Sequence, residues 1–373
     1  MIVVIADDLS GAAELAGAAL NRGLSAEVQT VFTPATDAGV ICVDTDTRSL
    51  PPAEAARVVG EVAHAVAAAK PGWIFKKCDS VLRGNVLAEI RAIMAATGMM
   101  RAVLVSANPS RGRVIRGGEY LINDQPVHET MFANDPEHPR RTSRVAALLG
   151  GDRSGVQAPD AASVDDLDRH AANLDGASLA AGGVEFFEAI LRARKVGCST
   201  GAVPSAGPAL RAQPVLFVCG SASAWASGRS QQCIARGIPL APMPEKLFHE
   251  GDAALIDDWT RTIASALKQR GAVMAAIAQA RLNASGPTRR LVTHLAAAVV
   301  RALETVPAGR VCAEGGATAA ALARASGWTR FAVTAQLAGG VVELHPLPAG
   351  APVFVIKVGS YDWPEAAWPS AAS

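Results

Sequence analysis

Two short polar segments in the first half of the sequence could carry chemistry. In the first, residues 6–12, Asp7, Asp8 and Ser10 follow directly after an apolar run at 2–6. In an open parallel sheet, ligands bind outside the carboxyl ends of the strands, where these side chains would lie. The alternative is that Asp8 or Ser10 only caps the following helix. Two adjacent aspartates exceed what one cap needs, because like charges repel and raise one of the two pKa values. We therefore expect at least one of them to be functional.

The second polar segment is residues 76–85, which follows an apolar run at 73–75. Lys77 and Arg83 can hold a carboxylate or a phosphate, and arginine does so through two parallel N–H groups. Asp79, Ser80 and Asn85 can bind sugar hydroxyl groups as donors and acceptors. The alternative is a solvated turn in which Asp79 and Arg83 form an ion pair four residues apart. The density of polar groups favours a binding site.

The sequence from 108 to 144 loses its regular pattern and is rich in proline, glycine and charged residues. Such a long irregular stretch in a compact domain is usually functional. Arg111 and Arg113 could hold an anion, but arginine is the usual cation of this chain, so the sequence leaves their role open.

Glycine- and serine-rich turns follow three expected strands in the second half. Such turns let backbone N–H groups approach phosphate oxygens, and a helix N-terminus adds positive potential. Three of them in one α/β domain suggest a nucleotide site, although neither a Walker A motif nor a GxGxxG motif after the first strand is present. The candidate nucleotide-binding residues are Ser221, Ser223, Gly315, Gly316, Ala317, Thr318 and Gly359.

The elements that must position these residues alternate between apolar strand-like runs and helical patterns, which predicts an α/β fold with mostly parallel sheets. We expect two domains, residues 1–205 and 206–373, each with flanking helices, joined by a linker at 196–213 that is rich in glycine, serine, alanine and proline. The expected strands are 2–6, 26–31, 40–43, 73–75, 102–106, 215–219, 273–277, 310–313, 341–345 and 353–357. The expected helices are 12–21, 53–69, 86–96, 224–236, 257–269, 288–304 and 318–325, with helical spacing also across 160–195.

Composition excludes several classes of protein. The chain has 373 residues, of which 50% are hydrophobic and 18% charged, so it is not a disordered polymer. A net charge of +1 and 5% aromatic residues argue against nucleic-acid or membrane partners. The absence of both a basic leader and a long apolar run, together with six scattered cysteines, favours a cytoplasmic protein. No metal ligands are predicted, because no second histidine lies at a helical spacing from His128.

Together these segments resemble the four-carbon acid sugar kinase family. The resemblance rests on ADDLSGAAE, KKCDSVLRGN, NPSRGR, GGEYLIND and PVHETMFANDPEHP in the first half, and on VCGSAS, EGGATAAAL and IKVGS in the second. It implies an ATP-dependent kinase of threonate, erythronate or 3-oxo-tetronate. The N-terminal domain would bind the sugar acid, the C-terminal domain would bind ATP, and the reaction would occur in the cleft between them.

The resemblance also implies roles for individual residues. Asp7 and Asp8 would lie beside the substrate, one of them as general base, and Arg83 would hold the carboxylate. The further substrate-binding residues would be Ser10, Lys77, Asp79, Ser80, Asn85 and Arg113. Mg²⁺ would accompany ATP, because phosphoryl transfer depends on positioning and charge neutralisation. A homodimer is left open.

This sequence departs from the family pattern mainly in the second half. Ala317 stands where the family has an acidic residue, and the ending at 359–362 is less rich in glycine. Glu14 replaces a usual aspartate, which is a mild change. An alternative is therefore a sugar-acid-binding protein with a degenerate nucleotide domain, or a lyase or isomerase that uses the same polar turns. A nicotinamide-dependent dehydrogenase is disfavoured by the missing glycine-rich motif.

Overall fold

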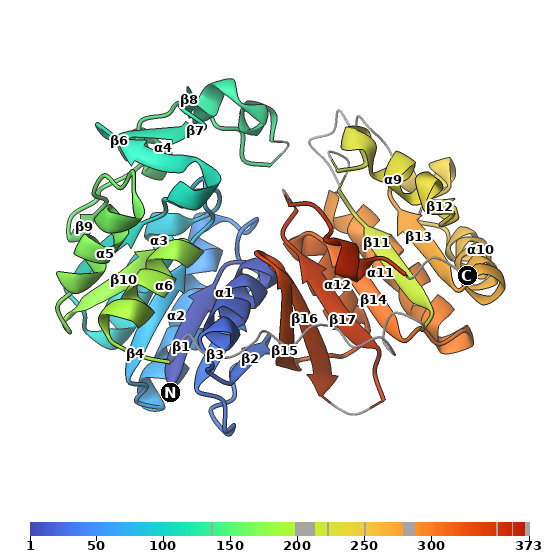
Figure 1. Ribbon diagram of the computed structural model, residues 1–373, viewed down its shortest axis with the longest axis horizontal. Coiled ribbons are helices and arrows are strands. Elements are labelled where there is room, and N and C mark those ends of the chain that lie inside the picture. Colours follow the sequence, from blue (N-terminus) through green and yellow to red (C-terminus); the bar gives the residue numbers. More distant parts are fainter. Residues whose placement is uncertain are drawn as a thin grey trace. The chain divides into compact units, whose positions relative to one another are not determined.

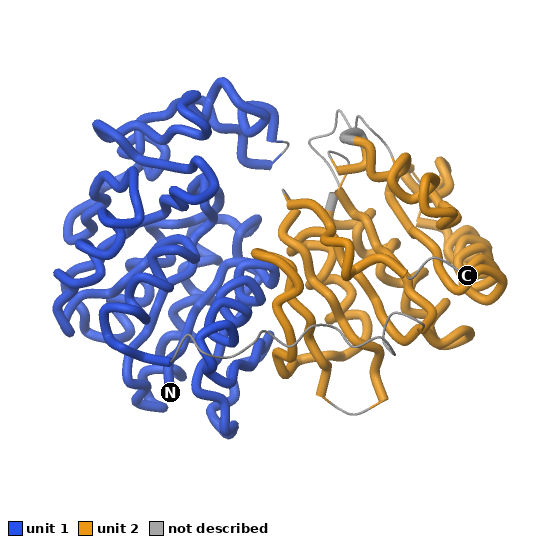
Figure 2. The backbone as a smooth tube through the Cα atoms, viewed as in Figure 1, with its two compact units in different colours: residues 1–201 blue, residues 202–373 orange. Residues whose placement is uncertain are grey.

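The chain is seen here in a computed structural model that describes residues 1–135, 137–197, 213–221, 224–249, 251–278, 288–347, 350–359 and 361–369 (Figure 1). It divides into two compact units, residues 1–201 and 202–373 (Figure 2). The predicted linker at 196–213 lies mostly outside the described residues.

The first unit is built on a parallel sheet whose strands follow one another in the order β2-β3-β1-β4-β10-β5-β9. Its strands are β1 (Ile2–Ala6), β2 (Ala26–Gln29), β3 (Val40–Asp44), β4 (Trp73–Lys77), β5 (Arg101–Val105), β9 (Val156–Gln157) and β10 (Ser178–Gly182). All five residues of β1 and of β3 are buried, as expected for central strands that helices cover on both faces.

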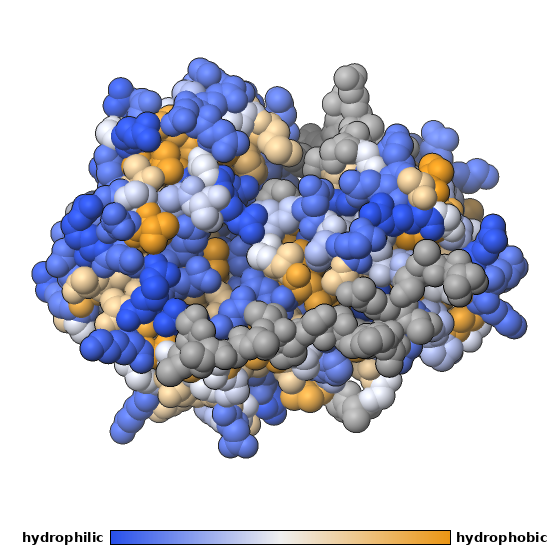
Figure 3. Space-filling view, viewed as in Figure 1, coloured by the Kyte–Doolittle hydropathy of each residue, from blue (hydrophilic) through white to orange (hydrophobic). Residues whose placement is uncertain are grey.

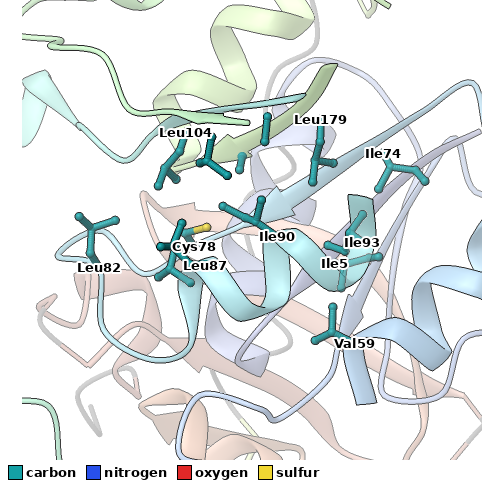
Figure 4. Packing of buried hydrophobic residues seen from close by; sticks show 14 of the residues in the cluster. Ile5, Val59, Ile74, Cys78, Leu82, Leu87, Ile90, Ile93, Leu104 and Leu179 are labelled. Atoms are coloured by element: carbon teal, nitrogen blue, oxygen red, sulfur yellow. The ribbon is translucent and has the colours of Figure 1, made fainter. Parts of the chain in front are cut away.

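Six α-helices accompany this sheet in the described part of the first unit. They are α1 (Leu9–Asn21), α2 (Pro52–Ala68), α3 (Val86–Thr97), α4 (Val145–Leu149), α5 (Val164–Ala172) and α6 (Val184–Ala193). Because side chains alternate along a strand, Ile5 faces Val59 of α2 and Ile90 of α3 in one buried cluster (Figure 4). On the opposite face, the ring centroid of Phe75 lies 5.3 Å from that of Phe187 in α6.

The predicted irregular stretch is partly regular. It contains a small antiparallel sheet of β6 (Arg113–Arg116), β7 (Glu119–Ile122) and β8 (Gln125–Pro126). The sequence prediction missed these strands because they are only two to four residues long and are joined by tight turns. The expected helical region 160–195 is also interrupted, since β10 separates α5 from α6.

The second unit has the strand order β12-β13-β11-β14-β17-β16-β15. Its strands are β11 (Val215–Cys219), β12 (Leu240–Pro242), β13 (Ala272–Ala276), β14 (Arg310–Glu314), β15 (Arg330–Ala338), β16 (Val341–Leu347) and β17 (Val353–Lys357). The neighbouring strands β12, β13, β11, β14 and β17 run parallel to one another, whereas β16 is antiparallel to both of its neighbours, β17 and β15. The expected α/β class with mostly parallel sheets and flanking helices is confirmed.

The helices of the second unit agree with the expected ones except near residue 224. The described α-helices are α9 (Ser230–Ala235), α10 (Ala253–Arg270), α11 (Thr288–Thr305) and α12 (Gly316–Ala325). The predicted helix 224–236 begins instead as a π-helical turn, Trp225–Arg229, in which Gly228 has a φ of 104°. This positive φ is easily adopted by glycine and breaks the regular helix. The sheet face that carries Phe217 is covered by Trp363 and Trp368, whose rings lie 5.8 and 4.9 Å from the Phe217 ring.

Exposed large hydrophobic side chains, such as Met100, Met131 and Ile234, come from separate elements. On the face drawn in Figure 3, hydrophobic residues occur in small groups among hydrophilic ones. Within the described ranges, no helix has the length and apolar character needed to cross a bilayer.

Candidate functional site

The carboxyl ends of three neighbouring strands gather the polar residues of the first unit. β1 lies between β3 and β4, and Ala6 at the end of β1 is in register with Asp44 on one side and Lys77 on the other. The residues that follow, including Asp7 and Asp79, therefore emerge at the same edge of the sheet. This is the edge at which open α/β sheets bind ligands.

Arg48 joins the carboxylates of this edge. Its Nε donates to Asp7 Oδ2 at 2.8 Å, and its Nη2 donates to Asp7 Oδ1 at 3.0 Å and to Asp8 Oδ1 at 2.9 Å. Its Nη1 lies 3.7 Å from Asp79 Oδ1. Burial raises the pKa of Asp7, but the positive charges of Arg48 and Lys76 outweigh this effect and lower it overall. Arg48 therefore helps to keep the Asp7 carboxylate ionised.

Asp8 is the N-cap of α1 as well as a partner of Arg48. Its Oδ1 accepts a hydrogen bond from Gly11 N at 2.9 Å, and its Oδ2 accepts one from Ser10 Oγ at 2.5 Å. The capping alternative for Asp8 is thus present in the structure. Ser10, predicted to bind substrate, donates its hydroxyl hydrogen to Asp8.

Asp79 and Arg83 form the ion pair that the sequence offered as an alternative, but it is mostly buried. Arg83 Nη2 donates to Asp79 Oδ1 at 2.8 Å and Arg83 Nε to Oδ2 at 3.0 Å, while Arg83 Nη1 donates to Asp135 Oδ2 at 2.9 Å. Burial raises the pKa of Asp79, yet Arg83 and Arg48 hold it well below its usual range. Arg83 would have to exchange one of these partners before it could hold a substrate carboxylate.

The other predicted substrate-binding residues also have internal partners. Lys77 Nζ donates to Cys78 O at 2.8 Å. Asn85 Nδ2 donates to the carbonyl oxygens of Thr47 and Leu50 at 3.1 and 2.8 Å, so it holds the 47–50 segment that carries Arg48.

Ser80 and Arg113 are brought together across the sequence. Arg113 Nη1 donates to Ser80 Oγ. The guanidinium carbons of Arg83 and Arg113 lie 5.6 and 5.7 Å from the centre of the Phe132 ring, which places the irregular stretch beside the 76–85 segment. The structure thus brings together the predicted substrate-binding residues of the first unit. Asn85 is the exception, because its side-chain amide donates to backbone carbonyl oxygens.

Asp44 is a member of this edge that the sequence analysis did not single out. It ends β3, is 3% exposed, and accepts a hydrogen bond from Asp46 N at 2.9 Å. No cation of the described residues forms an ion pair with it. Burial, together with the negative charge of Asp46, raises the pKa of Asp44 well above its usual value. Unlike Asp7, it can take up a proton without breaking an ion pair.

In the second unit, the predicted glycine turns also meet at one sheet edge. β14 lies between β11 and β17, with Cys219 and Lys357 in register with Glu314. Gly315 has a φ of 90°, which favours glycine, and none of the described residues has an atom within 4 Å of a Cβ placed on it. The described residues therefore leave space beside Gly315 at the N-terminus of α12.

The remaining predicted nucleotide-binding residues fall around this helix start. Gly316, Ala317 and Thr318 form the first turn of α12, where Ala317 is exposed and Thr318 is buried. A Cβ on Gly359 would lie 4.0 Å from the Cα of Gly315, so the two turns are neighbours. Ser221 Oγ accepts a hydrogen bond from Ala224 N at 3.2 Å. Ser223 lies outside the described residues.

A sequence profile described as a sugar-binding N-terminal domain matches residues 2–189, which is half of the chain. The chain belongs to this family. The matched residues lie within the first unit and include the whole edge formed by Asp7, Asp44 and Asp79.

Curated relatives of this sugar-binding domain protein include kinases. A D-threonate kinase from Salmonella typhimurium is 34% identical over 151 residues, which is 40% of this chain and 36% of that enzyme. A D-erythronate kinase from Heliobacterium modesticaldum is 36% identical over 154 residues, 40% of this chain and 35% of that enzyme. These alignments span about a third of the relatives. A D-threonate kinase from Cupriavidus necator is 28% identical over 411 alignment positions, 98% of this chain and 96% of that enzyme.

The fold of this sugar-binding domain protein recurs in solved structures. A protein from Salmonella typhimurium LT2 matches with a TM-score of 0.75 and 17% identity, over 97% of this chain and 96% of that one. At this identity the likeness concerns the fold alone.

Two residues of the sugar-binding domain, Arg48 and Asp44, were missed by the sequence analysis. Both belong to the segment DTDTRS, which follows the strand expected at 40–43. The rule that ligands bind at the carboxyl ends of parallel strands could have found Asp44, because it applies to this strand as it does to 2–6 and 73–75. The pairing of Arg48 with Asp7 and Asp8 depends on the fold and has no local signal.

Asp8, the N-cap of α1, leads to a test of packing at Gly11. A Cβ on Gly11 would lie 2.6 Å from Asp8 Oδ1 and 3.3 Å from Lys77 Cγ. Because Arg48 also holds Asp8, the carboxylate cannot move freely, and we expect Gly11→Ala to lower the free energy of unfolding by about 1–3 kcal/mol. Urea denaturation would measure this difference.

Gly60→Ala is the matched control for this substitution. Among the described residues outside its own helix backbone, a Cβ on Gly60, in the middle of α2, would meet only Ala92 Cβ at 3.9 Å. Alanine favours a helix interior by roughly 0.5–1 kcal/mol over glycine, so this variant is expected to be as stable as the parent or more stable. Equal stability changes for the two variants would contradict the tight packing around Asp8.

Proposed function

We propose that the protein is an ATP-dependent kinase that phosphorylates a hydroxyl group of a four-carbon sugar acid such as threonate, erythronate or 3-oxo-tetronate. The observation that carries the proposal is the alignment with a D-threonate kinase over 98% of the chain, because it includes the second unit as well as the sugar-binding domain. The polar sheet edge of the first unit supports binding of the sugar acid there, and the glycine turns of the second unit support binding of ATP there.

In this proposal the first unit binds the sugar acid. Arg48, Arg83 and Arg113 supply positive charge for the substrate carboxylate, and Ser80 and Asp79 supply hydrogen-bonding groups for hydroxyls. Because these side chains already pair with one another, the substrate must replace internal partners rather than water. Such replacement selects a ligand that carries both a carboxylate and hydroxyl groups.

The proton of the attacking hydroxyl needs an acceptor among the carboxylates of this edge. The sequence favoured Asp7 or Asp8, but both form ion pairs with Arg48, and Asp8 also caps α1. The pKa of Asp7 is lowered, which weakens it as a base. Asp44 has a raised pKa and no described cationic partner, so its proton affinity suits a general base better. We therefore assign this role to Asp44 and retain Asp7 and Asp8 as substrate-positioning groups.

ATP would bind at the sheet edge formed by Gly315, Gly316 and Gly359, where the N-terminus of α12 offers N–H groups and a positive dipole to phosphate oxygens. Over the described ranges, no group of three histidine, cysteine, aspartate or glutamate side chains could hold a metal. A magnesium ion would instead arrive on the nucleotide, because Mg²⁺ keeps most of its water and binds phosphates. When bound, the ion would neutralise charge on the transferred phosphoryl group.

The experiment that tests the proposal is ATP consumption by the purified protein with Mg²⁺, across D- and L-threonate, D- and L-erythronate, 3-oxo-tetronates and glycerate. Turnover with one four-carbon acid and not with glycerate is the expected result. Absence of turnover together with absence of ATP binding by calorimetry would reject the kinase and favour a sugar-acid-binding protein. ATP binding without turnover would direct the search to a different acid.

A further inference from the structure

Lys357 ends β17 with its side chain completely buried. A buried ammonium group is unfavourable unless it is paired and hydrogen-bonded. Lys357 Nζ lies 3.0 Å from Glu314 Oε1 and donates to the carbonyl oxygens of Val358 at 3.1 Å, Gly359 at 3.3 Å and Tyr361. A lysine in a phosphate-binding turn usually extends toward the ligand, whereas this one is directed into the protein, onto the backbone of its own turn.

The direction of these carbonyl groups determines the direction of the neighbouring N–H groups. In a planar trans peptide, the N–H points opposite to the C=O. Because the carbonyl of Val358 points at the buried ammonium, the N–H of Gly359 in the same peptide points away from it. The same carbonyl also accepts a hydrogen bond from Tyr361 N at 3.0 Å. Lys357 and this backbone bond therefore hold Gly359 with its amide hydrogen on the side of the turn that faces away from the interior.

The same buried charges support the neighbouring turn. Glu314 is 1% exposed and also accepts from Arg229 Nε at 3.0 Å and Nη2 at 3.2 Å. It directly precedes Gly315, whose N–H donates to Lys357 O at 2.9 Å. One cluster of Arg229, Glu314 and Lys357 thus lies under both the Gly315 turn and the Gly359 turn.

We propose that Lys357 is a positioning residue of the nucleotide site, which orients the Gly359 N–H toward the phosphate groups of the nucleotide without contacting them itself. The inference rests on the proposed function, because it assumes that the Gly315 and Gly359 turns bind a nucleotide. It specifies how that site acts: the Lys357 ammonium group donates hydrogen bonds to backbone carbonyl oxygens, and the backbone N–H of Gly359 donates to the phosphate.

The test compares binding of ATP with Mg²⁺ and binding of adenosine by titration calorimetry, in the full chain. Lys357→Met is expected to weaken ATP binding by about 10-fold or more and to leave adenosine binding nearly unchanged, because only the phosphates use the oriented N–H. Lys268→Met, which removes an exposed lysine at the end of α10, is the matched control and should change neither. In turnover assays, the KM for ATP should rise more than kcat falls.

A second variant separates positioning from direct contact and does not depend on the folding of Lys357→Met. Gly359→Pro removes the N–H and keeps the carbonyl, so it should reproduce the selective loss of ATP affinity. In a double-mutant cycle the two losses should not add, because both remove the same interaction. Additive losses would overturn the inference in favour of direct contact between Lys357 and phosphate.

The remaining outcomes distinguish the inference from the proposed function. Unchanged ATP binding by folded Lys357→Met overturns the inference alone and leaves the kinase in place. A parent protein that binds neither ATP nor adenosine overturns the nucleotide site and the inference with it.

Discussion

Arg48→Met is expected to lower the free energy of unfolding of residues 1–201 by about 3–5 kcal/mol, because it leaves three largely buried carboxylates without the cation that they share. Those of Asp7 and Asp8 accept hydrogen bonds from Arg48 at 2.8–3.0 Å, and that of Asp79 lies 3.7 Å away. For a unit of about 200 residues, this loss of unfolding free energy corresponds to a Tm lower by roughly 10 °C. Thermal and urea denaturation would measure both quantities.

The loss should depend on pH. In the parent protein the pKa values of Asp7 and Asp79 are lowered, so these groups contribute stability above their ordinary pKa and lose it as the pH falls through the lowered values. In Arg48→Met the pKa of Asp7 is expected to rise, because burial is then opposed mainly by Lys76, and the variant should gain stability when Asp7 is protonated. Arg83 continues to lower the pKa of Asp79 in this variant. The difference between the two proteins should therefore be largest near neutral pH and should shrink below about pH 4.

Arg57→Met provides the control, because it removes the same type of side chain from a solvent-exposed pair. Arg57 Nη1 lies 2.7 Å from Glu61 Oε1, with both side chains at least 60% exposed. Such pairs contribute at most about 0.5 kcal/mol, so little change is expected. If Arg48→Met were as stable as Arg57→Met, the bridging cation would not hold the sheet edge together.

Secondary structure was predictable from the sequence where apolar runs are continuous. The bounds of β1 (Ile2–Ala6) and β17 (Val353–Lys357) agree with the expected strands, because buried parallel strands have few polar interruptions. β10 was missed, since its residues SLAAG are small and lack the β-branched side chains that indicate a strand. β15 was missed although its burial alternates along most of the strand.

The site was predictable only in the parts that lie within one turn. The Asp79–Arg83 pair follows from a spacing of four residues, and the cap formed by Asp8 follows from its place before a helix. Arg48 reaches Asp7 from 41 positions away, and Glu314 reaches Arg229 from 85 positions away. Such pairs depend on which strands become neighbours, and no local pattern encodes this.

Asp44→Asn is expected to lower kcat with a four-carbon acid by about 100-fold or more, because it removes the proposed proton acceptor while keeping the size of the side chain. The KM for the acid should change less, since Arg48 and Arg83 remain to bind its carboxylate. In the parent protein, kcat should rise with pH as Asp44 loses its proton through its raised pKa. Steady-state kinetics across pH would measure both effects.

The same substitution should stabilise the protein, which distinguishes a functional carboxylate from a structural one. Asp44 has a raised pKa because burial and the charge of Asp46 disfavour its ionised form. Its contribution to stability is therefore present at low pH and is lost as the pH rises through the raised value. The asparagine side chain carries no charge, so we expect a gain of about 1–2 kcal/mol near pH 8 and a smaller gain near pH 5.

Asp8→Asn and Asp37→Asn complete the comparison. Asp8→Asn breaks an ion pair with Arg48 and should reduce stability, whereas Asp37 is exposed and its replacement should change neither stability nor kcat. If Asp44→Asn kept full turnover and Asp8→Asn abolished it in a folded protein, the base would be Asp8 despite its ion pair. If Asp44→Asn gains stability and loses turnover, the carboxylate of Asp44 is retained for catalysis, because folding alone would favour a neutral side chain at this position.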